Sequence, residues 1–101
     1  MKNYIASLNK AFESRVRLGI MAILLVNDTV DFGTLKEQLQ LTDGNMASHL
    51  SALEKANYIA ITKQFIGKKP NTTYSVTIDG RTAFSKHLDA LEQLIQNKHS
   101  A

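Results

Sequence analysis

Cysteine is absent from this chain of 101 residues. A disulfide framework, a thiolate nucleophile and a cysteine-based zinc site are therefore excluded, and any metal site would have to use the three histidines and the carboxylates. This composition fits a reducing cytosol, so we expect a cytoplasmic protein that uses neither a metal nor another cofactor.

Long hydrophobic runs are also missing. The longest uninterrupted apolar run, residues 20–26, has seven residues, whereas a membrane-spanning helix needs about 20. The first residues contain no apolar signal segment. Proline occurs once, at Pro70, and no low-complexity linker divides the chain. We therefore predict one domain over residues 1–101, without secretion or membrane insertion.

The formal net charge of +3 is unevenly distributed along the chain. Residues 1–26 contain four basic residues and one acidic residue, residues 27–43 one basic and four acidic, and residues 44–81 five basic and two acidic. Within residues 44–81, the basic residues surround a Gly67-Lys68-Lys69-Pro70 turn. Clustered basic residues attract phosphate backbones. An ordinary solvated surface is the alternative explanation of the charge alone.

The spacing of apolar residues predicts two helices at the start of the chain. The first is a short helix within residues 1–13, marked by Tyr4, Ile5, Leu8 and Phe12. The second begins after Ser14, which is suited to cap it, and runs to about residue 26. Its apolar residues lie around the whole circumference of the helix, so we expect other parts of the protein to pack against every side of it. Part of this packing would come from the terminal helices or from a second subunit.

A helix-turn-helix arrangement is predicted next. Residues 30–32 form a short extended piece, and Asp31 is suited to cap a helix that carries Leu35 and Leu39. Thr42 or Asp43 is suited to cap a second helix over residues 43–57. The inner side of this helix is marked by Met46, Leu50, Leu53 and Asn57. Two helices across a turn of about three or four residues define the arrangement.

A hairpin and a last helix follow. Residues 58–66 and 72–77 alternate between apolar and polar positions, which predicts two strands joined by a loop over residues 67–71. Thr77 is suited to cap a final helix over residues 78–97. The apolar seam of that helix consists of Phe84, Leu88, Leu91 and Ile95.

The predicted helix over residues 43–57 has an exposed polar side opposite its apolar side. At about 100° per residue, the outward positions are Asn45, Ser48, Ala52 and Lys55, with His49 on the flank. Short polar side chains suit insertion into the major groove of DNA, where Asn, Ser and His bond to base edges and Lys binds phosphates. For each residue taken singly, an ordinary solvated position is the alternative.

Three segments carry a resemblance to a known family. They are residues 32–59, with the motif Leu41-Thr42-Asp43-Gly44-Asn45 followed by Ser48-His49-Leu50 and Leu53-Glu54, and residues 67–74 and 77–81. These segments resemble the small winged helix-turn-helix transcriptional regulators of bacteria and archaea, in the broad MarR/ArsR-like grouping. The resemblance spans about residues 12–95. It departs from the family at Asn57, where Gly is usual, but Asn also tolerates the left-handed backbone that ends a helix.

The resemblance implies a mainly α (α+β) winged helix-turn-helix fold with a two-stranded hairpin wing, and a homodimer that binds double-stranded operator DNA. The helix over residues 43–57 would read the major groove, and residues 66–72 would form a wing on the backbone or minor groove. The implied DNA-binding residues are Asn45, Ser48, His49, Ala52, Lys55, Lys68 and Lys69. The helices in residues 1–13 and 78–97 would form the dimer interface through Tyr4, Ile5, Leu8, Phe84, Leu88, Leu91 and Ile95.

Three arginines leave alternatives open. Arg15, Arg17 and Arg81 either reach a phosphate or pair with a carboxylate such as Asp31 or Glu54, and we expect pairing.

Metal sensing is the second open point. Relatives of the ArsR type sense metals through Cys or through His/Asp pairs on the terminal helices, for which the candidates here are His87, Asp89 and His99. His87 and Asp89 are two residues apart and point away from each other on a helix, so they cannot share an ion within a subunit. We interpret His87 as a packed interface histidine and predict no metal site.

Two other function classes are weaker. A winged helix used only for protein contacts needs an apolar exposed face on the helix over residues 43–57, which Ser48, Ala52 and Lys55 do not provide. No Gly-rich phosphate loop after a strand, paired histidines on one helix face or Ser/His/acid motif supports catalysis. We therefore predict a sequence-specific DNA-binding regulator without enzymatic activity, with the protein-interaction module as the alternative.

Overall fold

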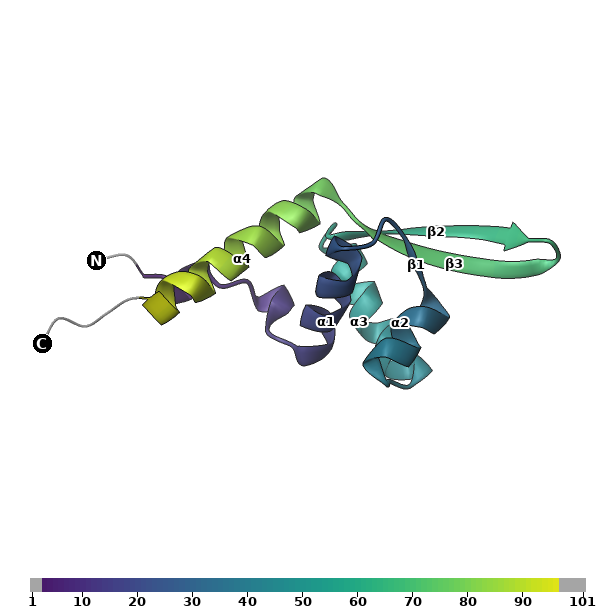
Figure 1. The fold of residues 1–101 in the computed structure, drawn as a ribbon, viewed down its shortest axis with the longest axis horizontal. Coiled ribbons are helices and arrows are strands. Elements are labelled where there is room, and N and C mark those ends of the chain that lie inside the picture. The colour runs from purple at the N-terminus through teal and green to yellow at the C-terminus, as the bar shows by residue number, and fades with distance from the viewer. Residues whose placement is uncertain (1–2, 97–101) are drawn as a thin grey trace, which may run out of the picture.

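The computed structural model describes residues 3–96 and confirms the predicted mainly α winged helix fold (Figure 1). Two 3₁₀ turns, η1 (Ile5–Ser7) and η2 (Lys10–Phe12), precede α1 (Arg15–Leu25), β1 (Val30–Asp31), α2 (Phe32–Leu39), α3 (Asp43–Lys55), β2 (Ile59–Ile66), β3 (Lys69–Val76) and α4 (Ile78–Gln96). Asn97, predicted to end the terminal helix, and the candidate metal ligand His99 lie outside the described residues. Within the described part, no helix has the length and hydrophobicity of a membrane span.

Each of the helices α1 to α4 begins at a predicted capping residue whose side-chain oxygen accepts a backbone N–H three positions later. The pairs are Ser14 with Arg17, Asp31 with Thr34, Thr42 with Asn45, and Thr77 with Gly80, at 2.7–3.3 Å. Thr42 is thus the cap of α3. Hydrogen bonds from the backbone and then the side chain of Thr34 lower the pKa of Asp31. The stabilisation from this carboxylate is therefore present at neutral pH and is lost as the pH falls through the lowered pKa.

Both α2 and α3 end at a residue with left-handed backbone. Gln40 has φ 53° and Asn57 has φ 63°, which confirms the predicted helix stop at Asn57. After α3, the N–H of Asn57 donates to the carbonyl of Glu54, and the N–H of Tyr58 donates to that of Leu53. This pair of bonds is the Schellman pattern, and it sends the chain from α3 directly into β2.

The sheet contains three antiparallel strands in the order β1-β3-β2, one more than the predicted two-stranded wing. The added strand is the predicted extended piece, in which Val30 lies opposite Tyr74 and Asp31 opposite Thr73. Burial raises the pKa of the Tyr74 hydroxyl, and the negative charge of Glu54 raises it further. The Tyr74 hydroxyl is therefore neutral at physiological pH where the sheet meets the helices.

The hairpin turn is shorter than predicted. Ile66 already pairs with Lys69, so the turn consists of Gly67 and Lys68. Gly67 has φ 65° at the first turn position, as a type II′ turn requires. The predicted loop over residues 67–71 is wrong because β3 begins at Lys69. Pro70 lies within β3 without disrupting it, since β1 does not extend beside this part of the strand.

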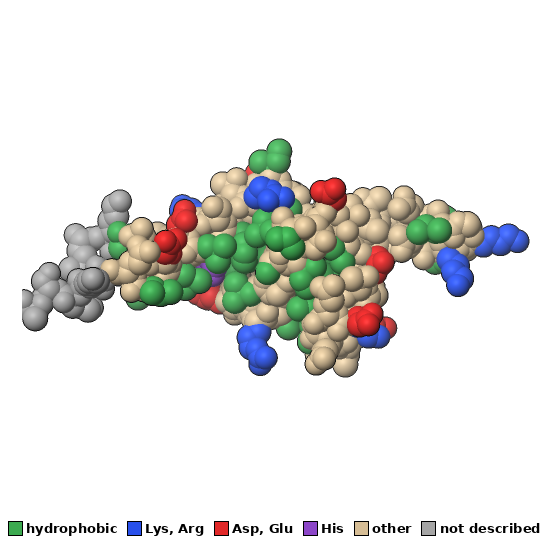
Figure 2. All heavy atoms as spheres, viewed as in Figure 1, with side chains coloured by type: hydrophobic (Ala, Val, Ile, Leu, Met, Phe, Trp, Pro, Cys, Tyr) green, Lys and Arg blue, Asp and Glu red, His purple; other side chains and the backbone are tan. Residues whose placement is uncertain are grey.

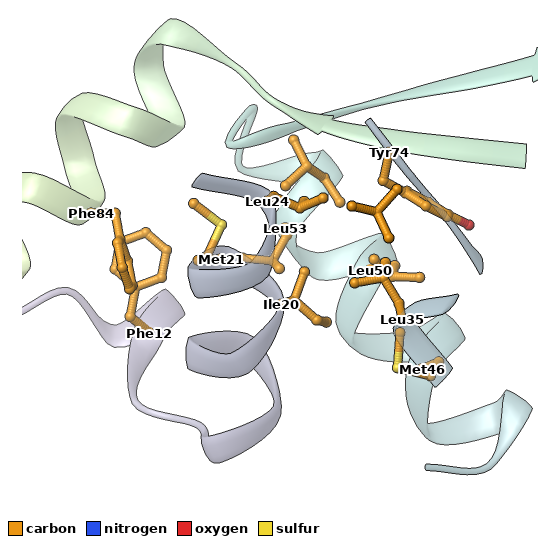
Figure 3. Close-up of a cluster of buried hydrophobic side chains, with 12 residues drawn as sticks. Phe12, Ile20, Met21, Leu24, Leu35, Met46, Leu50, Leu53, Tyr74 and Phe84 are labelled. Carbon is orange, nitrogen blue, oxygen red and sulfur yellow. The ribbon is translucent and has the colours of Figure 1, made fainter. Parts of the chain in front are cut away.

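One hydrophobic core joins the helices to the sheet (Figure 3). Its largest fully buried side chains are Phe12, Ile20, Met21, Leu24, Leu35, Met46, Leu53 and Ile59. The central helix α1 packs against α2, α3, β3 and η2. The predicted all-round cover of α1 is thus largely supplied by this chain, although Ala22 and Val26 are exposed.

The prediction of one helix within residues 1–13 is wrong. The two 3₁₀ turns are separated by extended backbone at Leu8 and Asn9. The Asn9 side chain accepts a hydrogen bond from the N–H of Ala11 at 2.9 Å and starts a new turn, which competes with a continuous helix. The backbone N–H of Asn9 donates to Nδ1 of His87 on α4, also at 2.9 Å. Tertiary contact with α4 therefore fixes the path of this segment.

The start of α4 is joined to the end of α3. The Thr77 hydroxyl donates to the carbonyl of Asn57 at 2.6 Å and accepts the N–H of Gly80, while the Asn57 side chain donates to Asp79 at 2.7 Å. Gly80 is buried against the backbone of Tyr58. A Cβ at Gly80 would lie far closer than 3.0 Å to the Tyr58 carbonyl oxygen. Only glycine fits this crossing.

Candidate nucleic-acid interface

The two faces of α3 lie as the sequence predicts, except that Asn57, predicted on the inner side, follows the end of α3 and is exposed. The inward side chains are at most 2 % exposed: Met46, Leu50 and Leu53. On the opposite side Asn45, Ser48 and Lys55 are exposed and Ala52 is half-buried. The Ser48 hydroxyl donates to the carbonyl of Asn45 at 3.2 Å, and the Asn45 side chain makes no hydrogen bond within the described residues. Small side chains with free hydrogen-bonding groups therefore face outward.

Two features near the start of α3 lie outside the predicted set. Lys36 of α2 forms an ion pair with Asp43 at 2.7 Å, which joins the two helices and offsets the negative charge in the first turn of α3. Gly44 and Ala47 are exposed beside Asn45. The small residues follow from helical spacing, but the ion pair crosses the turn between two helices and has no sequence periodicity to reveal it.

His49 is tied to α1. Its Nδ1 accepts a hydrogen bond from Nε of Arg17 at 3.1 Å, and its side chain is half-buried. A ring nitrogen that accepts this bond carries no proton, so the imidazole proton lies on Nε2. His49 therefore lies on the flank of α3, but Arg17 fixes the orientation of its ring. The Nε2–H group is the donor that remains for an acceptor outside the protein.

We expect Arg17→Met to release His49 from this single orientation. The variant removes the Nε donor but keeps much of the apolar stem, so both neutral tautomers of His49 should become populated. The loss of the bond should lower the free energy of unfolding by roughly 1–2 kcal/mol. Ring ¹⁵N chemical shifts of His49 measure the tautomer directly. Arg15→Met, an exposed position on the same helix, is the control, and unchanged His49 shifts in Arg17→Met would contradict the assignment.

Basic side chains gather at the end of the hairpin. Lys68 occupies the turn and Lys69 begins β3, and both are exposed as predicted. Lys63 is exposed on β2 in the outer part of the same hairpin, residues 63–72, which is called the arm below. Figure 2 shows basic side chains, in blue, projecting from the end of the molecule where the hairpin ends. The arm thus carries positive charge away from the helices.

The expectation that the arginines pair with carboxylates is wrong for the described residues. Arg17 bonds to an imidazole, and the ion pair among the described side chains joins Lys36 to Asp43. Arg15 and Arg81 are exposed. Asp31, one of the candidate carboxylate partners, caps α2 instead.

The predicted dimer-interface residues differ in exposure. Ile5, Leu88 and Ile95 are 68 %, 44 % and 83 % exposed, whereas Tyr4, Leu8 and Leu91 are half-buried. Phe84 is 4 % exposed and packs edge to face with Phe12, with 5.0 Å between ring centroids. The predicted interface role of Phe84 is therefore wrong, because this chain's own N-terminal segment already covers the ring.

His87 is also buried within the protomer. It accepts the Asn9 N–H and lies 5.4 Å from the ring centroid of Phe12. The prediction that His87 is packed is confirmed, but its packing partners belong to this chain and not to an interface. In residues 3–96, no three His, Asp or Glu side chains are grouped to hold a metal ion.

A capped helix-turn-helix pair, a hairpin that extends beyond it and a long terminal helix define a winged helix-turn-helix protein. The chain belongs to the family of winged helix DNA-binding domains, which matches it over residues 16–95. Its fold neighbours include members of the MarR and ArsR families of transcriptional regulators.

Three relatives illustrate the range of similarity. Protein MJ0432 of Methanocaldococcus jannaschii is 38 % identical over 88 residues, which cover 87 % of this chain and 96 % of the relative. The structure of a transcriptional regulator homologue from Pyrococcus horikoshii matches with a TM-score of 0.79 and 31 % identity, covering 86 % of each chain. A MarR-family protein from Porphyromonas gingivalis has a TM-score of 0.67 at 18 % identity over 88 % of this chain and 86 % of its own, and so shares the fold alone.

Proposed function

We propose that this protein is a sequence-specific, DNA-binding transcriptional regulator without enzymatic activity. In this proposal α3 enters the major groove of double-stranded DNA, and the hairpin over residues 66–72 contacts the adjacent backbone or minor groove. The observation that carries the proposal is the exposed face of α3, made mostly of small or polar residues, in a protein whose hairpin also carries exposed lysines. A major groove about 12 Å wide admits a helix with such short side chains.

The side chains of α3 suit different contacts. Asn45 offers an amide that bonds in bidentate fashion to adenine, and Ser48 offers a hydroxyl oxygen to a donor on a base. Ala52 presents a methyl group that suits the thymine methyl group, and Lys55 suits a phosphate. His49 offers Nε2–H to an acceptor such as a guanine edge or a phosphate oxygen.

We further propose that the protein acts as a homodimer. A second copy would cover exposed apolar side chains in the second half of α4 and in η1, namely Leu88, Ile95 and Ile5. Two-fold symmetry would present two α3 helices to half-sites about 34 Å apart along the DNA.

The contributions of the arm and of α3 can be separated by substitution. Lys68→Ala with Lys69→Ala should weaken binding to operator and random duplexes alike, and should reduce the slope of log affinity against log salt by roughly two per protomer bound. Ser48→Ala should reduce the preference for the operator by roughly 1–3 kcal/mol while leaving random-duplex binding and the salt slope nearly unchanged. Titrations of an operator selected from genomic fragments, and of a random duplex, at several salt concentrations measure both effects.

Two outcomes would count against the proposal. If the lysine variant alters only operator binding, or Ser48→Ala weakens both duplexes equally, α3 is not the element that reads the bases. If the wild-type protein binds no duplex at low salt, the winged helix serves protein contacts instead.

A further inference from the structure

The outer part of the hairpin is a free arm. The strand β1 reaches only Thr73 and Tyr74 of β3, so from the pair Lys63–Thr72 onward β2 and β3 pair with each other alone. Four residue pairs form this outer part, up to Ile66–Lys69 at the turn. Residues 62–70 are all exposed, and Figure 1 shows the hairpin extending away from the helices.

The end of this arm carries apolar side chains among polar ones. Phe65 is 73 % exposed and Ile66 is 64 % exposed. Phe65 lies directly opposite Pro70, so the two form an apolar pair on one face of the ribbon. Ile66 lies on the other face, opposite Lys69. The hairpin does not need this aromatic ring for its core, because Phe65 packs in no buried cluster.

We propose that the Phe65–Pro70 pair is a wedge that enters the minor groove of bound DNA, partly unstacks a base step and bends the duplex. The inference rests on the proposed function, since α3 must first place the arm beside DNA. Phe and Pro are side chains that proteins insert between base steps at a kink. The arm is long enough to reach past the helices, and it is only two strands wide (Figure 1).

The positive charge around the Phe65–Pro70 pair favours DNA as its binding partner. Lys68 and Lys69 flank the pair at the turn, and Lys63 lies on the same face two residues before Phe65. A polyanion neutralises the charges of these lysines, while contact with the bases removes the apolar pair from water. A second copy of the arm would bring the same lysines together and would be repelled.

The test compares Phe65→Ser with Gln64→Ser, two exposed positions on opposite faces of the arm, of which Gln64 lies outside the proposed wing over residues 66–72. The probe is a mixed-sequence fragment of about 120 base pairs, shorter than the persistence length of about 150 base pairs, so ligase closes it into a circle slowly unless it is bent. Protein is added to saturation, as established by fluorescence anisotropy on the same DNA. We expect wild type and Gln64→Ser to accelerate circle formation equally. The rate of circle formation with Phe65→Ser should be about tenfold or more lower than with wild type.

The outcomes separate this inference from the proposed function. Saturated binding with equal circle formation by wild type and Phe65→Ser overturns the wedge but leaves DNA binding intact, whereas no binding by any form is a failure of the proposed function. An equal loss in Gln64→Ser also overturns the assignment to the Phe65–Pro70 pair. A change of oligomeric state in Phe65→Ser without DNA, or loss of binding to anionic lipid vesicles, would assign the tip to another occupant and overturn the proposal.

Discussion

Gly80→Ala is expected to lower the free energy of unfolding by roughly 3 kcal/mol or more, because the new methyl group overlaps the carbonyl of Tyr58. That oxygen is backbone, and the Thr77–Asn57 hydrogen bond holds the same crossing together, so neither side can move without breaking other bonds. Thermal and urea unfolding, followed by circular dichroism at one fixed protein concentration, measure the loss. For a domain of this size the midpoint should fall by about 12 °C or more.

Gly44→Ala provides the matched control. A Cβ at Gly44 would meet no atom within 4 Å, and the residue lies in the first turn of α3. Alanine should therefore leave stability unchanged or raise it by up to about 1 kcal/mol. Wild-type stability in Gly80→Ala would show that α4 can shift away from Tyr58, and would contradict the tight crossing.

The double variant Leu88→Glu with Ile95→Glu is expected to convert the proposed homodimer into a monomer. Both side chains are exposed in the protomer, at 44 % and 83 %, so the charges should disturb the interface and not the core. Losing the second α3 removes the gain from simultaneous binding, so operator affinity should fall by about 100-fold or more. Light scattering gives the mass, and anisotropy titration gives the affinity.

Ile78→Glu is the control for this prediction. Ile78 is 86 % exposed and lies at the opposite end of the same helix. This substitution should leave the protein dimeric and folded. Dissociation of the dimer by Ile78→Glu alone would place the dimer contact elsewhere. A wild-type protein that is monomeric at tens of micromolar would contradict the proposed dimer.

Local sequence features account for the successful part of the fold prediction. The caps Ser14, Asp31 and Thr77 are predictable from the sequence because a capping side chain bonds to a backbone group only three residues away. The inward face of α3 follows from a periodicity contained in one helix. The helix stop at Asn57 follows from the resemblance, in which Gly is usual at this position, together with the tolerance of Asn for the left-handed backbone.

Features that depend on distant contacts were not predictable from the same patterns. An apolar seam on α4 shows that Phe84 is covered, but not whether Phe12 of the same chain or a second subunit covers it. Likewise, the bond that orients His49 joins residues 32 positions apart on two helices. The third strand has only two residues, and its pairing with Tyr74 depends on the position of the whole hairpin.

The hydrogen bonds from Thr77 to Asn57 and from Asn57 to Asp79 make α4 a lever attached to α3. With 19 residues, α4 is about 28 Å long. If the whole helix tilts by about 10° about its C-terminal end, its N-terminal end, where it is bonded to α3, moves by about 5 Å. That displacement exceeds the rise of one base pair, about 3.4 Å. In the proposed dimer, the spacing of half-sites is therefore set far from the DNA, by the angle at which two α4 helices meet.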